Sequence, residues 1–86
     1  MNIKVNEKIS VLSIFNAKTN HVRPHIIKWN NRKYTITQIG LHHTIHIGKT
    51  LHHIFSVTSG TTYFRLNLNT ENLHWILEEV DSGDSL

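Results

Sequence analysis

Apolar and polar residues alternate along most of the chain, in short runs that are separated by turn-forming residues. The apolar positions are rich in Ile, Val, Phe, Tyr and Trp, and alternation with a period of two is typical of half-buried strands. The pattern predicts strands in 8–15, in a hairpin over 25–39 and in a meander over 41–80. We therefore expect an all-β fold, a single small antiparallel barrel or sandwich of about six strands. Residues 1–80 would form this one domain, and 81–86 a flexible C-terminal tail.

Two features of the 25–39 segment and its end predict local geometry. Asn30 and Asn31 tolerate positive φ, so they predict a two-residue hairpin turn that places Ile27 opposite Tyr34. Gly40 predicts a bend or bulge, because the spacing of the apolar residues changes there.

The segment 41–57 contains five of the eight histidines, and its register decides where they point. A three-residue loop at 48–50 places His43 opposite Phe55 and gathers the apolar residues on one face. A two-residue loop would instead place His42 opposite Phe55. The apolar pattern favours the longer loop.

The strands that follow extend the same apolar face. A turn at Ser59-Gly60 pairs Phe55 with Phe64. The last segment, 69–80, has the spacing of an amphipathic helix as well as that of a strand, and we predict a strand because its register continues the face. The expected core residues are Phe55, Phe64, Leu66, Trp75 and Ile27.

This register sorts the histidines onto two faces. His43 and His53 point into the apolar face, where we expect buried polar side chains that are neutral and hydrogen-bonded. Facing imidazoles on the outer face can share a zinc ion, but structural zinc sites use four ligands and catalytic ones three, so a solvated face is the simpler interpretation. A metal- or pH-responsive domain, with zinc as its cofactor, is the alternative function. The outer row that would serve it consists of His42, His46, His52 and His74.

A second candidate site is the basic hairpin 23–34. Cations that contact phosphates, together with aromatic side chains that stack on bases, are typical of small β-domains that bind single strands or RNA. Trp29 faces the same side as Ile27, so it also fits the core, and the cations then remain for a nucleic acid or an anionic protein. The candidate nucleic-acid-binding residues are Arg23, Lys28, Trp29, Arg32 and Lys33.

Composition narrows the class of function. The chain has 86 residues, no cysteine and a formal net charge of +3, so the core is small and neither a disulfide nor a thiolate metal site is expected. No acidic residue lies in 8–70 to orient a catalytic histidine, and no phosphate-binding glycine loop occurs. We expect a non-enzymatic protein without a cofactor. No apolar leader or membrane-spanning run is present, which predicts a soluble, cytoplasmic protein without membrane contact.

Three stretches of the chain resemble a family of short uncharacterised bacterial proteins of unknown function. They are "RPHIIKWNNRKYTITQIG" at 23–40, "YFRLNL" at 63–68 and "LHWILEEV" at 73–80. The resemblance implies a small β-domain with no established activity, and some members look as though they accompany DNA-repair proteins. We therefore expect a binding module that holds a nucleic acid or a protein partner through the hairpin 23–34.

Overall fold

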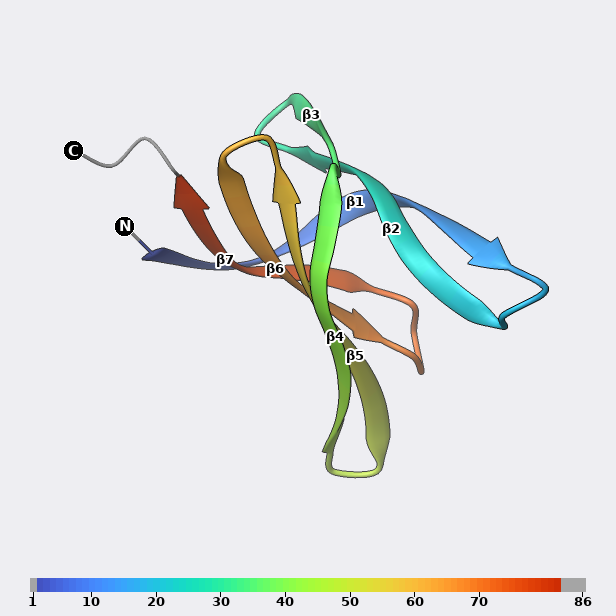
Figure 1. Cartoon of the computed structure of the whole chain (residues 1–86). Coiled ribbons are helices and arrows are strands. Elements are labelled where there is room, and N and C mark those ends of the chain that lie inside the picture. The colour runs from blue at the N-terminus through green and yellow to red at the C-terminus, as the bar shows by residue number, and fades with distance from the viewer. Residues whose placement is uncertain (1, 83–86) are drawn as a thin grey trace.

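The protein is one curled antiparallel sheet of seven strands (Figure 1). The computed structural model describes residues 2–82. The strands follow in the order β3-β2-β1-β7-β6-β5-β4 across the sheet, so the meander β4 to β7 lies beside the first strand, as predicted. The strands are β1 (Asn2–Asn16), β2 (His21–Trp29), β3 (Arg32–Thr35), β4 (Gln38–Ile47), β5 (Thr50–Ser59), β6 (Thr62–Asn69) and β7 (Trp75–Ser82). The prediction of a small antiparallel all-β domain is confirmed.

A short connection curls the sheet into a half-barrel. β3 and β4 lie at opposite edges of the sheet, yet only Ile36 and Thr37 separate them in the chain. The backbone N–H of Thr37 donates to the carbonyl of Thr58 over 2.8 Å, which holds the connection against β5. The two edges must therefore approach each other at this end. At the other end the β1–β2 and β4–β5 hairpins diverge and leave the half-barrel open (Figure 1).

The hairpin β2–β3 has the predicted register. Asn30 and Asn31 have φ values of 52° and 61°, which is the left-handed conformation that both central residues of a type I′ turn require. Ile27 pairs with Tyr34. A bulge also occurs at the predicted place, where the β4–β5 register shifts on passing Gly40.

The predicted register of the β4–β5 hairpin is wrong by one residue. Its turn is the two-residue Gly48-Lys49 with Gly48 at φ 62°, and His42, not His43, faces Phe55. The prediction assumed that all apolar bulk of the hairpin lies on one face. Ile54 lies on the other face, where its neighbours bury it completely. Since both faces of this hairpin carry apolar residues, the apolar pattern could not distinguish the two registers.

The β5–β6 pair is displaced by two residues from its predicted register. Phe55 faces Leu66 instead of Phe64, because the turn lies one residue later than expected. A displacement by two leaves each side chain on its face, so the predicted apolar face survives.

The segment 69–80 contains a strand and no helix, as predicted. β7 begins at Trp75, which pairs with Leu68. β7 also extends through Asp81 and Ser82, so the predicted tail does not begin at 81, and its residues 83–86 lie outside the described part of the chain.

The core lies on the inner, concave face of the sheet. Phe64 is fully buried at its centre, and its ring meets those of Tyr34 and Trp29 edge-on, at centroid distances of 5.0 and 6.5 Å. All five predicted core residues are buried, together with Val57, Leu68, Leu77 and Val80. Within residues 2–82, no helix has the length and apolar character needed to cross a membrane.

Candidate functional site

The open end of the half-barrel contains a cleft of about 700 Å³. It exists because β1 changes its partner: residues up to Ile9 pair with β7, and those from Ser10 onward pair with β2. The sheet therefore divides beyond the pair of Ile9 with Trp75. Along residues 10–16, β1 has a strand partner on the β2 side only, and its other edge faces the cleft.

The cleft is apolar at its floor and at its rim. Leu68 and Trp75 form the floor, and Val11 and Val22 line the β1–β2 wall. The large hydrophobic side chains with the highest exposed fractions are at the rim. These rim residues are Phe15, with 62% of its surface exposed, and Leu73, with 70%.

Leu73 combines this exposure with an unfavourable backbone conformation. Its φ is 62°, in the left-handed region that side chains other than Gly, Asn and Asp rarely adopt. The loop 70–74 is closed on the end of β6 at this point, because the N–H of Leu73 donates to the carbonyl of Asn69 over 2.8 Å. A strained, exposed leucine contributes little to folding, and such strain is concentrated at functional sites.

A pair of histidines lies in the cleft wall formed by β4 and β5. His42 Nε2 and His53 Nδ1 are 2.7 Å apart, and the ring planes differ by 24°, so the rings meet edge to edge through one N–H···N hydrogen bond. Phe55 stacks on the face of His42, with ring centroids 4.2 Å apart and planes 4° apart. His42 is thus held in one orientation by a neighbouring ring and a hydrogen bond.

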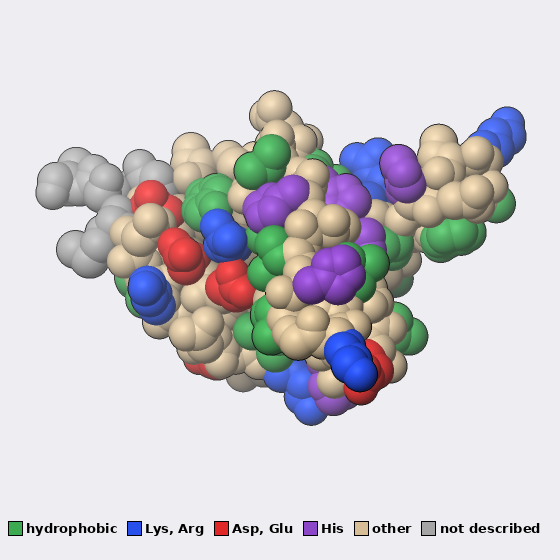
Figure 2. Space-filling view, turned by 90° about the horizontal axis from the view of Figure 1, so that it is seen from below, with side chains coloured by type: hydrophobic (Ala, Val, Ile, Leu, Met, Phe, Trp, Pro, Cys, Tyr) green, Lys and Arg blue, Asp and Glu red, His purple; other side chains and the backbone are tan. Residues whose placement is uncertain are grey.

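This contact disfavours full protonation of the pair. One bridging proton makes the hydrogen bond, whereas two protonated imidazoles would place two N–H donors against each other. Partial burial lowers the pKa of His42, and positive charge on His53, His21 and His43 lowers it further. Burial likewise lowers the pKa of His53, with a smaller effect of charge on His21. His21 also lines the cleft. Figure 2 shows histidine side chains gathered on one face, beside the β1–β2 hairpin that projects to the right.

The outer histidine row predicted from the sequence is not assembled. His46 faces Leu51 on the inner side, and His74 precedes β7 in a loop. Only His52 lies on the outer face as predicted, opposite Ile45 and not His46. Within residues 2–82 no three His, Cys, Asp or Glu side chains come together as a metal site.

The predicted pair of buried histidines also needs correction. His43 lies on the outer face opposite Ile54 and is half-buried, because the one-residue register change exchanges it with His42. His53 keeps the predicted inner face but is likewise half-buried. The buried histidine is His52, which is 9% exposed.

His52 begins a polar network across the outer face of β5, β6 and β7. Its Nδ1 donates to Asn67 Oδ1 over 2.7 Å, and Asn67 Nδ2 donates to Glu78 Oε2 over 2.8 Å. Arg65 Nε donates to the other carboxylate oxygen of Glu78, also over 2.8 Å. Because an amide oxygen only accepts, this chain fixes the proton of His52 on Nδ1.

The basic hairpin exposes its cations, whereas its tryptophan is half-buried. Lys28 and Lys33 pair across β2 and β3 and are exposed, as are Arg23 and Arg32. Trp29 packs against the core ring of Phe64, and its Nε1 is buried without a hydrogen-bond partner in the described chain. The indole therefore belongs in part to the core, and its remaining surface lines the groove beside the hairpin.

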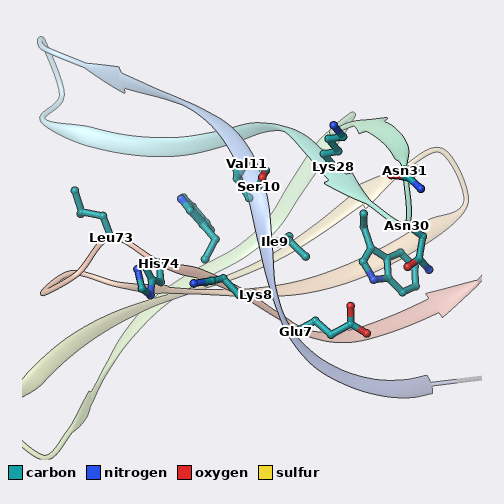
Figure 3. A pocket seen from close by; sticks show the side chains of 12 residues that line it. Glu7, Lys8, Ile9, Ser10, Val11, Lys28, Asn30, Asn31, Leu73 and His74 are labelled. Atoms are coloured by element: carbon teal, nitrogen blue, oxygen red, sulfur yellow. The ribbon is translucent and has the colours of Figure 1, made fainter.

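A shallow groove of about 650 Å³ crosses β1 next to this hairpin (Figure 3). Leu73 and His74 lie at one end of it and Asn30 and Asn31 at the other, while Lys8 lies between them (Figure 3). Leu73 therefore borders both this groove and the cleft at the open end.

The cleft joins residues that sequence patterns do not connect. The sequence pattern placed neither His21 nor Leu73 in a site. His21 begins β2 and Leu73 lies in the loop between β6 and β7, so no strand pattern links them. The signal that could have identified Leu73 is its position as an apolar residue among the polar residues of a turn-rich segment.

No family model, curated protein or solved structure with which the chain was compared matches it. The resemblance of its hairpin and last strands to a family of short bacterial proteins therefore stays a prediction.

Proposed function

We propose that this chain is a non-enzymatic binding module that takes an extended, apolar segment of a protein partner into the cleft at the open end of the half-barrel. The observation that carries the proposal is Leu73, a strained and 70% exposed leucine at the rim. This leucine stabilises neither its own backbone nor the core, and contact with a ligand would explain its position.

The unpaired edge of β1 supports an extended segment as the ligand. The N–H and C=O groups of residues 10–16 that face the cleft have no strand partner. A peptide in the cleft could pair with this edge and place alternate side chains on Trp75 and Leu68, which is the β-augmentation mode of recognition. The apolar lining favours such a protein segment over a nucleic acid.

The cations of hairpin 23–34 have a supporting role in this proposal. Lys28, Lys33, Arg23 and Arg32 are exposed and would attract acidic residues that flank the bound segment. Electrostatic attraction of this kind mainly raises the association rate and weakens with salt. The hairpin would therefore mainly raise the association rate, and the cleft would determine which segment binds.

A second candidate function is a pH-responsive form of the same module. Its support is the contact between His42 and His53, which line the cleft with His21. Acidification would charge these imidazoles beside the bound segment and separate the paired rings. We restrict this candidate to protons, because no three ligating side chains of the described residues converge on a metal position.

Selection from a displayed library of random 12-residue peptides tests the proposal. We expect extended apolar sequences whose dissociation constants rise at least about tenfold for Leu73→Gly and for Phe15→Ser, since each removes one rim contact worth about 1.4 kcal/mol or more. Thr35→Ser, in the far edge strand β3, is the matched control.

Two results would contradict the proposal. Selected peptides could bind the rim variants as tightly as the parent protein. Alternatively, single-stranded DNA or RNA oligomers could bind at about 50 mM salt with a strong salt dependence while no peptide is selected, in which case hairpin 23–34 is a nucleic-acid site.

A further inference from the structure

The two edge strands of the sheet differ in how they are protected from pairing with other strands. β3 has four residues, among them Arg32 and Lys33, and short, charged edges discourage further pairing. β4 has ten residues with the sequence QIGLHHTIHI, which contains no Lys, Arg, Asp, Glu or Pro. It lies at the end of the strand order and pairs with β5 on one side. Its other edge has none of the usual protection over residues 41–47.

The outer face of β4 also carries an apolar stripe that its own core does not use. Leu41 and Ile47 are each 55% exposed, and Ile45 is 37% exposed. Their cross-strand neighbours on β5 place all three on the face opposite Phe55. An unprotected edge next to exposed aliphatic side chains is a surface suited to another strand.

The sequence of this edge is complementary to itself about Thr44. If two copies of β4 pair antiparallel across a two-fold axis at Thr44, Leu41 of one copy faces Ile47 of the other on the outer face. On the inner face, His42 of one copy faces His46 of the other. His43 of one copy faces Ile45 of the other, also on the outer face. The outer face of the pair is thus mainly aliphatic, and the inner face carries imidazoles and hydroxyls.

Other two-fold positions fit less well. An axis at His43 would extend the pairing into the bulge at Gly40, and an axis at Ile45 would extend it into the turn at Gly48. Thr44 is the midpoint of the regular stretch between these two irregularities. The register about Thr44 therefore uses all seven residues from 41 to 47.

We propose that β4 pairs with β4 of a second copy of this chain and forms a symmetric homodimer with one continuous sheet. A C2 contact of this kind is isologous, so each copy uses the same strand. The interface is one strand pair with a stripe of aliphatic side chains, which is the scale of weak interfaces with dissociation constants in the micromolar range.

The dimer places imidazoles of two copies side by side on the inner face. His42 of each copy lies beside His46 of the other. The titratable groups near His42 in its own copy are His53 on β5, His21 on β2 and His43, its neighbour along β4 on the outer face. All of these groups are neutral or positive, so acidification adds repulsion across the interface. The dimer should weaken as pH falls.

Sedimentation equilibrium of the full chain, at about 5 to 300 µM and pH 7.5, tests the proposal with charge variants at the axis. Thr44 is exposed and would face itself, so Thr44→Lys and Thr44→Glu should each be monomeric, because each places like charges opposite one another. An equimolar mixture of the two should dimerise again. Thr35→Lys, an exposed threonine on the other edge strand, should dimerise like the parent protein.

Three results would overturn the proposal: a parent protein that is monomeric throughout, a Thr44→Lys variant that dimerises as well as the parent, or a mixture that associates no better than its components. Circular dichroism checks that each variant folds, and Thr44→Arg or Thr44→Asp replaces a Thr44 variant of the same charge that does not fold. Between pH 7.5 and 5.5 the dissociation constant of the parent should rise at least about tenfold. An unchanged constant would refute the placement of His42 beside His46.

Discussion

Replacing Phe64 by alanine should remove a large part of the stability of the protein. The side chain is fully buried, and its ring meets Tyr34 and Trp29 edge-on at 63° and 86°. Truncation of a buried phenylalanine to alanine costs about 3 to 5 kcal/mol, from lost transfer energy and from the cavity that remains. The two aromatic pairs place Phe64→Ala toward the upper end of this range.

This loss is large relative to the whole domain. A chain of 86 residues is expected to have a free energy of unfolding of about 4 to 13 kcal/mol. A loss of 3 kcal/mol or more would lower the Tm by at least about 12 °C, because 1 kcal/mol shifts the Tm of such a domain by about 4 °C or more.

Urea unfolding at 25 °C, followed by circular dichroism, measures the effect. The matched control is Phe15→Ala, a phenylalanine of the same sheet that is 62% exposed and whose truncation should change stability by about 0.5 kcal/mol or less. If Phe64→Ala lies within 1 kcal/mol of the parent, or if both variants lose equal stability, the description of the core around Phe64 is incorrect.

Three other substitutions or conditions give separate expectations. Leu73→Gly should raise the free energy of unfolding by about 1 kcal/mol, because glycine adopts a φ of 62° without strain, and a loss in urea unfolding would contradict the argument that Leu73 is strained. The pKa values of His42 and His53 are lowered from 6.5 in the folded state, so the unfolded chain binds more protons than the folded chain just below pH 6.5. The free energy of unfolding should therefore fall as pH falls below 6.5 and be constant above it. Urea titrations across pH 5 to 8 measure this slope, and a slope that persists in a His42→Gln, His53→Gln double variant would assign it to other groups. Asn67→Leu should cost about 1 to 3 kcal/mol, since it leaves the buried His52 and a carboxylate oxygen without their partner, and thermal unfolding that matches the parent would show that the outer network contributes nothing.

The sequence by itself determined which segments are strands and which side chains form the core. Period-two alternation located the strands, and the pair Asn30 and Asn31 determined one hairpin register, because only a turn with two positive φ values fits there. The core around Phe64 could also be predicted, since a strand that slips by two residues keeps the same face.

The tertiary structure alone decided the β4–β5 register and therefore the positions of the histidines. A slip by one residue is visible in a pattern only if the two faces differ in polarity, and this hairpin has Phe55 on one face and Ile54 on the other. Edge strand β4 also exposes Leu41 and Ile47, so its apolar residues do not mark the core. His42 and His43 exchanged faces for this reason.

The sequence pattern also could not predict the cleft. Phe15, His21, His53 and Leu73 come from four separate elements, and they meet because β1 leaves β7 after Ile9 and continues with β2. Alternation along one strand carries no information about where that strand changes partner. The long-range pairing of the sheet sets that point, and the cleft is a consequence of it.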